Sequence, residues 1–169
     1  MNPARILRIA VPLAIALAVY LIAYHWAPER QVARRQAAFV GAIDGADHGT
    51  YSRLISPSYS DRWGFTHDSA IQGIRDLSRH FLSLQADYSP ASLVAEGETW
   101  VATGQLKLGG QGNAIAQEAV ARANRLTEPF TFSWQKESWK PWDWQLVQID
   151  HPNLHVPSSY TRGAAFDIY

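Results

Sequence analysis

The strongest constraint in this sequence is an apolar stretch with no Asp, Glu, Lys or Arg between Arg8 and Glu29. A helix of about 20 apolar residues crosses a hydrocarbon core of roughly 30 Å, because it rises about 1.5 Å per residue. The stretch ends in Tyr24, His25 and Trp26. Tyrosine and tryptophan rings favour the headgroup level of a bilayer. The sequence therefore predicts a single transmembrane helix as an N-terminal anchor.

The alternative interpretation is a cleaved signal peptide, which also begins with basic residues such as Arg5 and Arg8. A signal peptide has a shorter apolar region and closes on small residues, whereas residues 23–28 place bulky rings at that point. We therefore prefer an uncleaved anchor over residues 1–28. The residues expected at the membrane interface are Tyr24, Trp26, Arg30, Arg34 and Arg35.

The basic residues flanking the predicted span are balanced, so the positive-inside rule gives no orientation. A very short tail ahead of a first span usually stays in the cytoplasm. We therefore expect a single-pass protein whose following domain lies on the exported side, periplasmic or extracellular. The chain contains no cysteine. That composition is compatible with export but excludes disulfide bonds.

Residues 29–169 are numerous enough to fold as one domain with a substantial core. The formal net charge is zero, and no basic stripe is visible, which argues against a nucleic-acid partner. Residues 109–112 are glycine-rich but lack the lysine and hydroxyl residue of a phosphate-binding loop. His151 and His155 flank a proline and lack a clear third ligand. We therefore expect no cofactor and no metal.

Helical spacing dominates the first half of the predicted domain. From Pro28 to Asp44, a repeat of Val32, Gln36, Phe39, Val40 and Ile43 predicts one amphipathic helix. A short helix is expected over Thr50 to Ile55. A third begins at Thr66 or His67 and continues to Leu84, with an apolar stripe of Ile71, Ile74, Leu77, Phe81 and Leu84.

Alternation at a period of two dominates the second half. Strands are predicted from Asp87 to Gly97, Thr99 to Leu108, Phe130 to Gln135 and Trp142 to Asp150. Residues 109–112 are expected to be flexible and 152–169 an irregular tail. For Asn113 to Leu126 a helix is preferred, and a strand remains open. Because helices come first and strands afterwards, the sequence predicts an α+β domain whose helices cover one face of a curved antiparallel sheet.

This order of elements resembles the nuclear transport factor 2-like (NTF2-like) superfamily, also called SnoaL-like or the cystatin-like α+β cone. The resemblance lies in the long first helix ending at Asp44 to Asp47, the short helix into Ile55-Ser56-Pro57, the Ser69 to Leu84 helix, the hairpin at Glu96 to Ala102, and the pair 129–134 with 142–147. It covers most of residues 29–151. It implies a funnel-shaped cavity that serves different members as an enzyme pocket, a ligand site or a dimerisation surface, so the fold does not supply the activity.

The resemblance implies that an enzyme of this type would place an Asp and a His, sometimes with a Tyr, inside the cone. The possible members here are Tyr51, Tyr59, Asp61, His67, His80 and Asp150. The favoured catalytic candidates are Asp61, His67 and His80, although no pair of them can be placed within hydrogen-bond reach from sequence. A pocket for a small apolar ligand would be lined by Trp100, Phe132, Trp134 and Phe81.

Aromatic residues gather near the C-terminal end. Trp139, Trp142 and Trp144 cannot all point into one core, because side chains alternate along a strand. The predicted interaction residues are Trp139, Trp142, Trp144, Tyr160, Phe166 and Tyr169.

These residues favour a membrane-anchored, non-catalytic interaction domain, an accessory or assembly subunit of a larger membrane complex. Its expected partners are the lipid bilayer and other subunits of that complex, with a homodimer as an alternative. A small apolar ligand-binding module and a small hydrolase, isomerase or dehydratase remain open.

Overall fold

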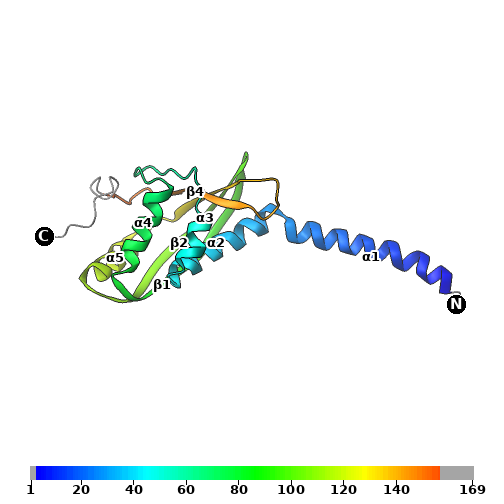
Figure 1. The fold of residues 1–169 in the computed structure, drawn as a ribbon, viewed down its shortest axis with the longest axis horizontal. Helices are drawn as coiled ribbons and strands as arrows, with labels where there is room; N and C mark the ends of the chain where they lie inside the picture. Colours follow the sequence, from blue (N-terminus) through cyan, green and yellow to red (C-terminus); the bar gives the residue numbers. More distant parts are fainter. Residues whose placement is uncertain (1–2, 157–169) are drawn as a thin grey trace.

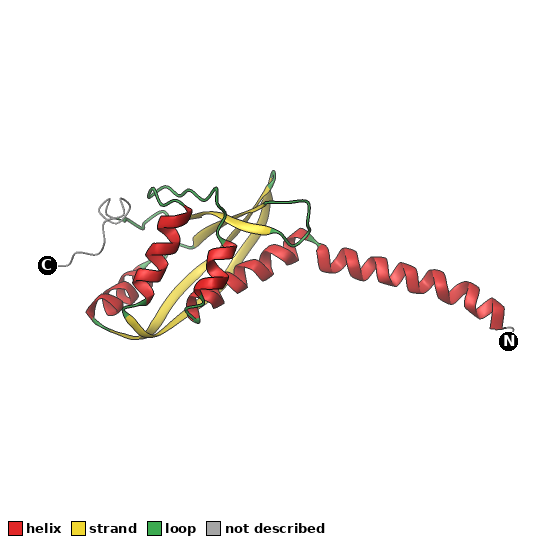
Figure 2. Ribbon diagram, viewed as in Figure 1, coloured by secondary structure: helices red, strands yellow, loops and turns green. Residues whose placement is uncertain are grey.

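A computed structural model describes residues 3–156, with side chains described for 11–22 and 24–156. In chain order the elements are α1 (Pro3–Trp26), α2 (Pro28–Asp44), α3 (His48–Leu54), α4 (His67–Ser78), β1 (Phe81–Glu96), β2 (Thr99–Gly112), α5 (Ala114–Arg125), β3 (Phe130–Lys136) and β4 (Trp144–Asp150). The strands form one sheet in the order β1-β2-β3-β4, in which every neighbouring pair is antiparallel. Helices and sheet form a curved body from which α1 extends (Figures 1 and 2).

Helix α1 exposes apolar side chains along its described length, including Leu13 at 70% and Val19 at 60% exposure. Within the described residues, no individual helix combines the length and apolar character needed to cross a membrane. The segment Val11–Trp26 together with α2 meets both measures as a pair bent by 47°. The predicted single span is therefore not found in this part of the chain. The helix breaks at Ala27, whose ψ of 127° is extended, because the ring of a following proline disfavours the helical conformation.

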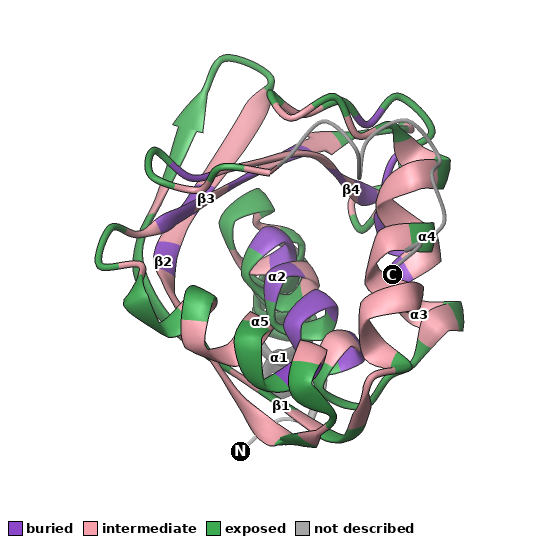
Figure 3. Ribbon diagram, turned by 90° about the vertical axis from the view of Figure 1, so that its left-hand side faces the viewer, coloured by how far each residue is buried: buried purple, intermediate pink, exposed green. Residues whose placement is uncertain are grey.

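Helix α2 confirms the prediction made for residues 28–44. Pro28 occupies the first turn of the helix, where its missing N–H costs no hydrogen bond. Val32, Phe39 and Val40 are buried, at exposures of 0%, 1% and 7%. Figure 3 shows α2 enclosed by the curved sheet on one side and by α3 and α4 on the other. The helix therefore fills the concave side of the sheet.

The two short helices that close this side are fixed by their caps. Asp47 accepts a hydrogen bond from the Thr50 backbone N–H at 3.0 Å, so α3 begins slightly earlier than predicted. Thr66 and Ser69 form a capping box at the start of α4. Their side chains satisfy backbone groups that the first turn of a helix leaves unpaired.

The core lies where α2 meets β3 and β4. The Phe39 ring packs edge to face against those of Phe132 and Trp134, each at a centroid distance of 6.3 Å. Phe132, Trp134 and Leu146 are almost fully buried, at 2%, 0% and 0% exposure. Register shifts at Pro90/Ser92 and Ser133/Trp134 interrupt the ladders, and bulges of this kind increase bending and twist. The predicted α+β architecture with a curved antiparallel sheet is confirmed.

The prediction for residues 79–84 was wrong. Helix α4 ends at Ser78, and Phe81 begins a strand that pairs with β2 as far as Gly112. Residues 109–112, predicted to be flexible, form the end of β2. Gly110 has a φ of +125°, and a Cβ atom there would lie 2.0 Å from the Ser83 carbonyl oxygen. The glycines bring two backbones closer than other residues allow, so strand pairing overrides the helical spacing of Phe81 and Leu84.

The predicted helix after this hairpin is confirmed as α5. Its N-cap is Asn113, whose side-chain oxygen accepts hydrogen bonds from the backbone N–H groups of Ile115 and Ala116 at 3.1 and 3.2 Å. The last strand begins at Trp144 rather than at Trp142, because Ser138 and Asp143 close the preceding turn through a hydrogen bond of 2.5 Å.

Replacing Gly110 by alanine should lower the free energy of unfolding by at least about 2 kcal/mol, because the new Cβ meets backbone atoms and the positive φ is strained. Chemical denaturation of the full chain measures the effect. Gly41→Ala is the matched control, since a Cβ there has nothing within 4 Å. It should retain or raise stability by up to about 1 kcal/mol. Equal stability of the two variants would contradict the assigned close approach.

Candidate functional site

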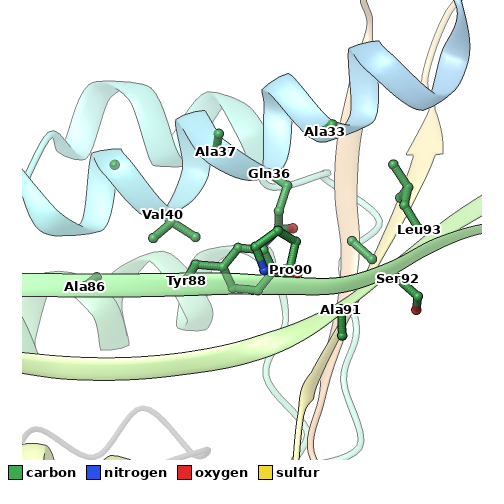
Figure 4. A pocket seen from close by; sticks show the side chains of 12 residues that line it. Ala33, Gln36, Ala37, Val40, Ala86, Tyr88, Pro90, Ala91, Ser92 and Leu93 are labelled. Carbon is green, nitrogen blue, oxygen red and sulfur yellow. The ribbon is translucent and has the colours of Figure 1, made fainter.

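A cavity of about 570 Å³ lies between α2 and the hairpin formed by β1 and β2. Figure 4 shows α2 above this space and β1 below it. The lining is mainly alanine and aliphatic residues: Ala33, Gln36, Ala37, Val40, Gly41, Ala86, Tyr88, Pro90, Ala91, Ser92, Leu93 and Ala102. Cavities of this size with an apolar lining and few polar groups are typical sites for small molecules.

The local structure of β1 gives the cavity its shape. The register between β1 and β2 shifts between Pro90 and Ser92, which leaves Ala91 as a bulged residue. Because β1 is an edge strand, the missing N–H of Pro90 costs no interior hydrogen bond. A Cβ atom at Gly104 would lie 2.6 Å from two ring atoms of Tyr88. Glycine at this position therefore leaves room for the Tyr88 ring.

Gln36 is one of two buried polar residues of α2, with 3% exposure, and it lines this cavity. The Trp134 indole N–H donates a hydrogen bond to Gln36 Oε1 at 2.9 Å. The amide Nε2 is buried and has no hydrogen-bond partner among the described residues. In Figure 4 the Gln36 side chain extends from α2 toward β1, where Tyr88 and Pro90 lie. A buried donor without a partner is costly, so this atom marks a place where a ligand acceptor would be stabilised.

Tyr88 contributes the second polar group. Its ring packs edge to face against Phe132 at a centroid distance of 5.6 Å. The hydroxyl is buried and likewise lacks a partner among the described residues. Burial raises the pKa of Tyr88 to about 12, because removal from water disfavours the phenolate. At neutral pH the group is therefore a protonated phenol that can donate one hydrogen bond and accept another.

The residues predicted for the pocket lie elsewhere. Phe132 and Trp134 fill the core, Trp100 packs partly buried against that core, and Phe81 begins β1. None of the four lines the cavity described above. In the sequence, Gln36 stands on the apolar stripe of α2 and was not among the predicted site residues. An uncharged polar residue within a buried stripe was the signal that pointed to this site.

The predicted catalytic residues occupy separate local networks. Asp61 accepts hydrogen bonds from Tyr59 Oη at 3.0 Å and from the backbone N–H of Phe65 at 2.9 Å. His67 pairs with Asp68 at 2.8 Å, and Asn113 Nδ2 lies 2.9 Å from His80 Nδ1. These contacts stabilise a loop, a helix start and the end of the β1–β2 hairpin.

The remaining members of the implied acid–base set are also held by neighbours. His48 Nδ1 lies 2.5 Å from Tyr51 Oη, and Asp150 pairs with Arg62 at 3.1 Å. Burial and the nearby Asp61 carboxylate raise the pKa of Tyr59. A hydrogen-bonded tyrosine with a raised pKa remains neutral, which suits a structural role.

The predicted absence of a metal site concerned His151 and His155. His151 is fully buried, and its Nε2 lies 2.9 Å from the Glu128 carbonyl oxygen. Its Nδ1 accepts a hydrogen bond from the Asn153 N–H at 3.1 Å. Among the side chains that the structure describes, no three of His, Cys, Asp and Glu are grouped as a metal site requires.

The three tryptophans of the predicted interaction surface differ in exposure. Trp139 is 83% exposed and Trp142 47%, whereas Trp144 is buried at 6%. The Trp144 indole N–H donates to the Pro141 carbonyl oxygen at 3.0 Å. Tyr160, Phe166 and Tyr169 lie outside the described residues.

The residues predicted for the membrane interface gather at the joint between α1 and α2. The guanidinium carbon of Arg30 lies 3.1 Å from the centroid of the Tyr24 ring. Arg34 contacts His25 at 3.1 Å. The rings of Trp26 and Trp142 lie edge to face at 6.4 Å, and Arg35 donates two hydrogen bonds to the Trp142 carbonyl oxygen. The turn before β4, which carries the exposed Trp142, therefore contacts the joint between α1 and α2.

No protein-family model and no curated protein matches the chain. Solved structures do. A conserved protein from Planctomyces limnophilus superposes with a TM-score of 0.55 at 13% identity, over 72% of this chain and 91% of that protein. A protein of the NTF2-like family from Streptomyces avermitilis, a dehydratase candidate by name, also superposes with a TM-score of 0.55. The identity is 15%, over 72% of this chain and 93% of that protein.

The fold is NTF2-like. Bd1075 from Bdellovibrio bacteriovorus also superposes with a TM-score of 0.55, at 10% identity and over 72% of this chain. The match spans 38% of the length of Bd1075. At these identities the likeness concerns the fold alone, so the function has to be argued from the cavity of this chain and its side chains.

The raised pKa of Tyr88 makes stability depend on pH in the alkaline range. An unfolded tyrosine ionises near pH 10, whereas folded Tyr88 does so at about 12. The stability from keeping this phenol neutral is therefore fully present below about pH 10 and is lost as pH rises to about 12. Ultraviolet titration of wild type and Tyr88→Phe should show one phenol ionising near pH 12 that the variant lacks. Identical titration curves would refute the assigned burial.

Proposed function

We propose that this protein is a membrane-bound, NTF2-like binding module that holds a small, mainly apolar molecule in the cavity between α2 and β1. The observation that carries this proposal is the pair of buried, unpartnered polar atoms, Gln36 Nε2 and Tyr88 Oη, on an apolar lining. An apolar lining favours an apolar ligand through desolvation. The two polar atoms favour a ligand with one carbonyl or hydroxyl oxygen.

The hydrogen-bonding roles of Gln36 and Tyr88 indicate which polar group the ligand should carry. Trp134 donates to Gln36 Oε1, which leaves the amide N–H of Gln36, a residue of the cavity lining, as a donor without a partner among the described residues. Tyr88, neutral below its raised pKa, provides a second donor. A ligand carbonyl accepting from both groups would satisfy atoms that are costly to leave unpaired. A purely aliphatic ligand would leave them unpaired, so the site should discriminate between the two classes.

A catalytic role has less support. The Streptomyces protein is a dehydratase candidate by name, but the predicted acid–base residues Asp61, His67 and His80 are absent from the lining of the cavity. A glutamine does not titrate in water, and a tyrosine with a pKa near 12 is a weak general acid at neutral pH. Binding therefore accounts for the chemistry of this site better than hydrolysis, isomerisation or dehydration does.

Prodan, a neutral naphthalene ketone, is a suitable probe of this cavity, and its emission changes when it leaves water. Wild-type full chain in a non-ionic detergent should bind Prodan saturably and 6-propyl-2-(dimethylamino)naphthalene, which lacks only the carbonyl oxygen, at least about tenfold more weakly. Gln36→Leu should remove this discrimination because it removes the amide donor.

Two further variants make the test specific. Ala37→Leu places a larger side chain in the cavity and should weaken binding of both probes. Ala121→Leu on α5 is the matched control, because residue 121 does not line the cavity. Binding that is the same in wild type, Ala37→Leu and detergent alone would contradict the proposal.

The membrane part of the proposal is supported by α1. Apolar side chains such as Leu13, Leu17 and Ile22 are 70%, 57% and 48% exposed, and the helix extends away from the folded domain (Figure 1). Exposure of these apolar side chains to water is unfavourable, whereas the hydrocarbon core of a bilayer accommodates them. Tyr24, Trp26 and Arg30 follow at its end, where aromatic and basic residues suit an interface. Together with the bend at Ala27, this supports insertion of α1 into a bilayer. The exported side of the domain is proposed from the sequence alone, because a very short tail ahead of a first span usually stays in the cytoplasm.

We expect the full chain to remain with the membrane after alkaline carbonate extraction. Leu17→Arg should shift it toward the soluble fraction, because a charge at the centre of a span costs about 2.5–3.5 kcal/mol, whereas Leu17→Ile should behave as wild type. Since the chain has no cysteine, a label on the variant Glu98→Cys, at an exposed position of the β1–β2 turn, reports the side of the domain. Extraction of the wild type into water would refute insertion, and labelling only from the cytoplasmic side would refute export.

The assembly role suggested by the aromatic residues is a second candidate, favoured by the 83% exposure of Trp139. A subunit contact would bury this ring. Crosslinking from a Trp139→Cys variant in native membranes tests it: a specific crosslinked partner supports the role. A monomer that carries no crosslink refutes it.

A further inference from the structure

A second cavity, of about 480 Å³, lies where α2 and α3 meet the turn before β4. It shares no lining residue with the apolar cavity. Its lining is strongly basic, with Arg35 from α2, Arg53 from α3 and Lys140 from the turn. Asp143 is the single carboxylate in the lining. The elements thus bring together cations that lie far apart in the sequence.

The carboxylates near these cations are Asp143 in the lining and Asp47. Hydrogen bonds from Thr50 and, to a smaller extent, the charge of Arg53 lower the pKa of Asp47. Among the described side chains, none of Arg35, Arg53 and Lys140 forms a salt bridge. Asp143 accepts a hydrogen bond from Ser138 at 2.5 Å. Three cations around one cavity repel one another, and an anion placed among them would remove that repulsion.

Two of the cations are held in place by hydrogen bonds. Arg35 donates from Nε and Nη2 to the Trp142 carbonyl oxygen at 3.0 and 2.6 Å. Arg53 donates from Nη2 to Thr50 Oγ1 at 3.2 Å. The guanidinium groups are therefore partly oriented before a ligand arrives, which reduces the entropy lost on binding.

The cavity also lies beside the end of α1. Trp142 is part of its lining, and the Trp142 ring contacts Trp26 at a centroid distance of 6.4 Å. With α1 in a bilayer, the basic cavity would face the headgroup region, where phosphate groups are concentrated.

We propose that this basic cavity binds a phosphate group, held by Arg35, Arg53 and Lys140 through charge-assisted hydrogen bonds. The inference rests on the proposed membrane association only for the source of the phosphate, an anionic phospholipid headgroup. A free phosphate ion offers the same chemistry from water. The Trp142 ring, half-exposed at 47%, lies between the cations and α1 and suits contact with the glycerol part of a lipid.

The test uses the full chain in a non-ionic detergent and three soluble probes: dihexanoylphosphatidylglycerol, dihexanoylphosphatidylcholine and inorganic phosphate. Calorimetric titration should show saturable binding of phosphatidylglycerol and at least about tenfold weaker binding by the double variant Arg53→Gln, Lys140→Gln. The double variant Arg79→Gln, Arg122→Gln, which removes an equal charge from exposed sites outside the cavity, should bind as wild type. The double variant Arg53→Lys, Lys140→Arg keeps both charges and should bind within about threefold of wild type.

The outcomes separate the two sources. Weaker binding of inorganic phosphate and phosphatidylcholine than of phosphatidylglycerol assigns an anionic headgroup, and inorganic phosphate that competes equally well assigns a free phosphate; both support the site. Absence of saturable binding by any probe, or equal binding by wild type and the Arg53→Gln, Lys140→Gln double variant, overturns it. Prodan binding in that double variant reports on the apolar cavity alone, so failure of one site is distinguishable from failure of the other.

Discussion

The burial of α2 in the concave face of the sheet is the interaction on which the rest of this structure depends. Phe39 packs edge to face against Phe132 and Trp134, and Trp134 donates its indole N–H to Gln36. Apolar contact supplies the favourable free energy of this packing. The hydrogen bond fixes the rotation of the helix and the orientation of the Gln36 amide. The Trp134–Gln36 hydrogen bond thus stabilises the core and also positions a residue of the proposed ligand site.

The same packing explains why the cavity lies beside the core rather than inside it. Large rings on β3 fill the space under α2, whereas small residues on α2, such as Ala33 and Ala37, face β1. The bulge at Ala91 and the absence of a side chain at Gly104 shape β1 on that side. Binding of a small molecule between α2 and β1 would therefore leave the aromatic core intact.

The two proposed sites lie against different faces of helix α2. Gln36 faces the apolar cavity, while Arg35 lines the basic one, because adjacent residues of a helix point in directions about 100° apart. A lipid phosphate at Arg35 and an apolar molecule at Gln36 would contact neighbouring residues of one helix. Such an arrangement suits a domain that takes a poorly soluble ligand near a membrane surface.

Periodicity in the sequence was enough to determine α2, β3 and the order of helices before strands, whereas it left residues 113–126, which include α5, open between helix and strand. Helix α2 and strand β3 have strong local signals, such as the repeat of Val32, Gln36 and Phe39 and the alternation of Phe130, Phe132 and Trp134. The sequence did not determine the end of α4, because Phe81 and Leu84 fit a helix and a strand equally well. Pairing with the glycines of β2 decided it.

The position of the proposed ligand site could likewise be found only in the tertiary structure. Sequence patterns identify which residues face inward, but they do not show which large side chains fill the space between two elements. Phe132 and Trp134 were inward as expected, yet they became core, and the cavity formed where alanines oppose a bulge. The sequence determined the layers and the apolar helix ahead of them. Only packing in three dimensions decided where space and unpaired polar atoms remain, because that outcome depends on volumes contributed by distant segments.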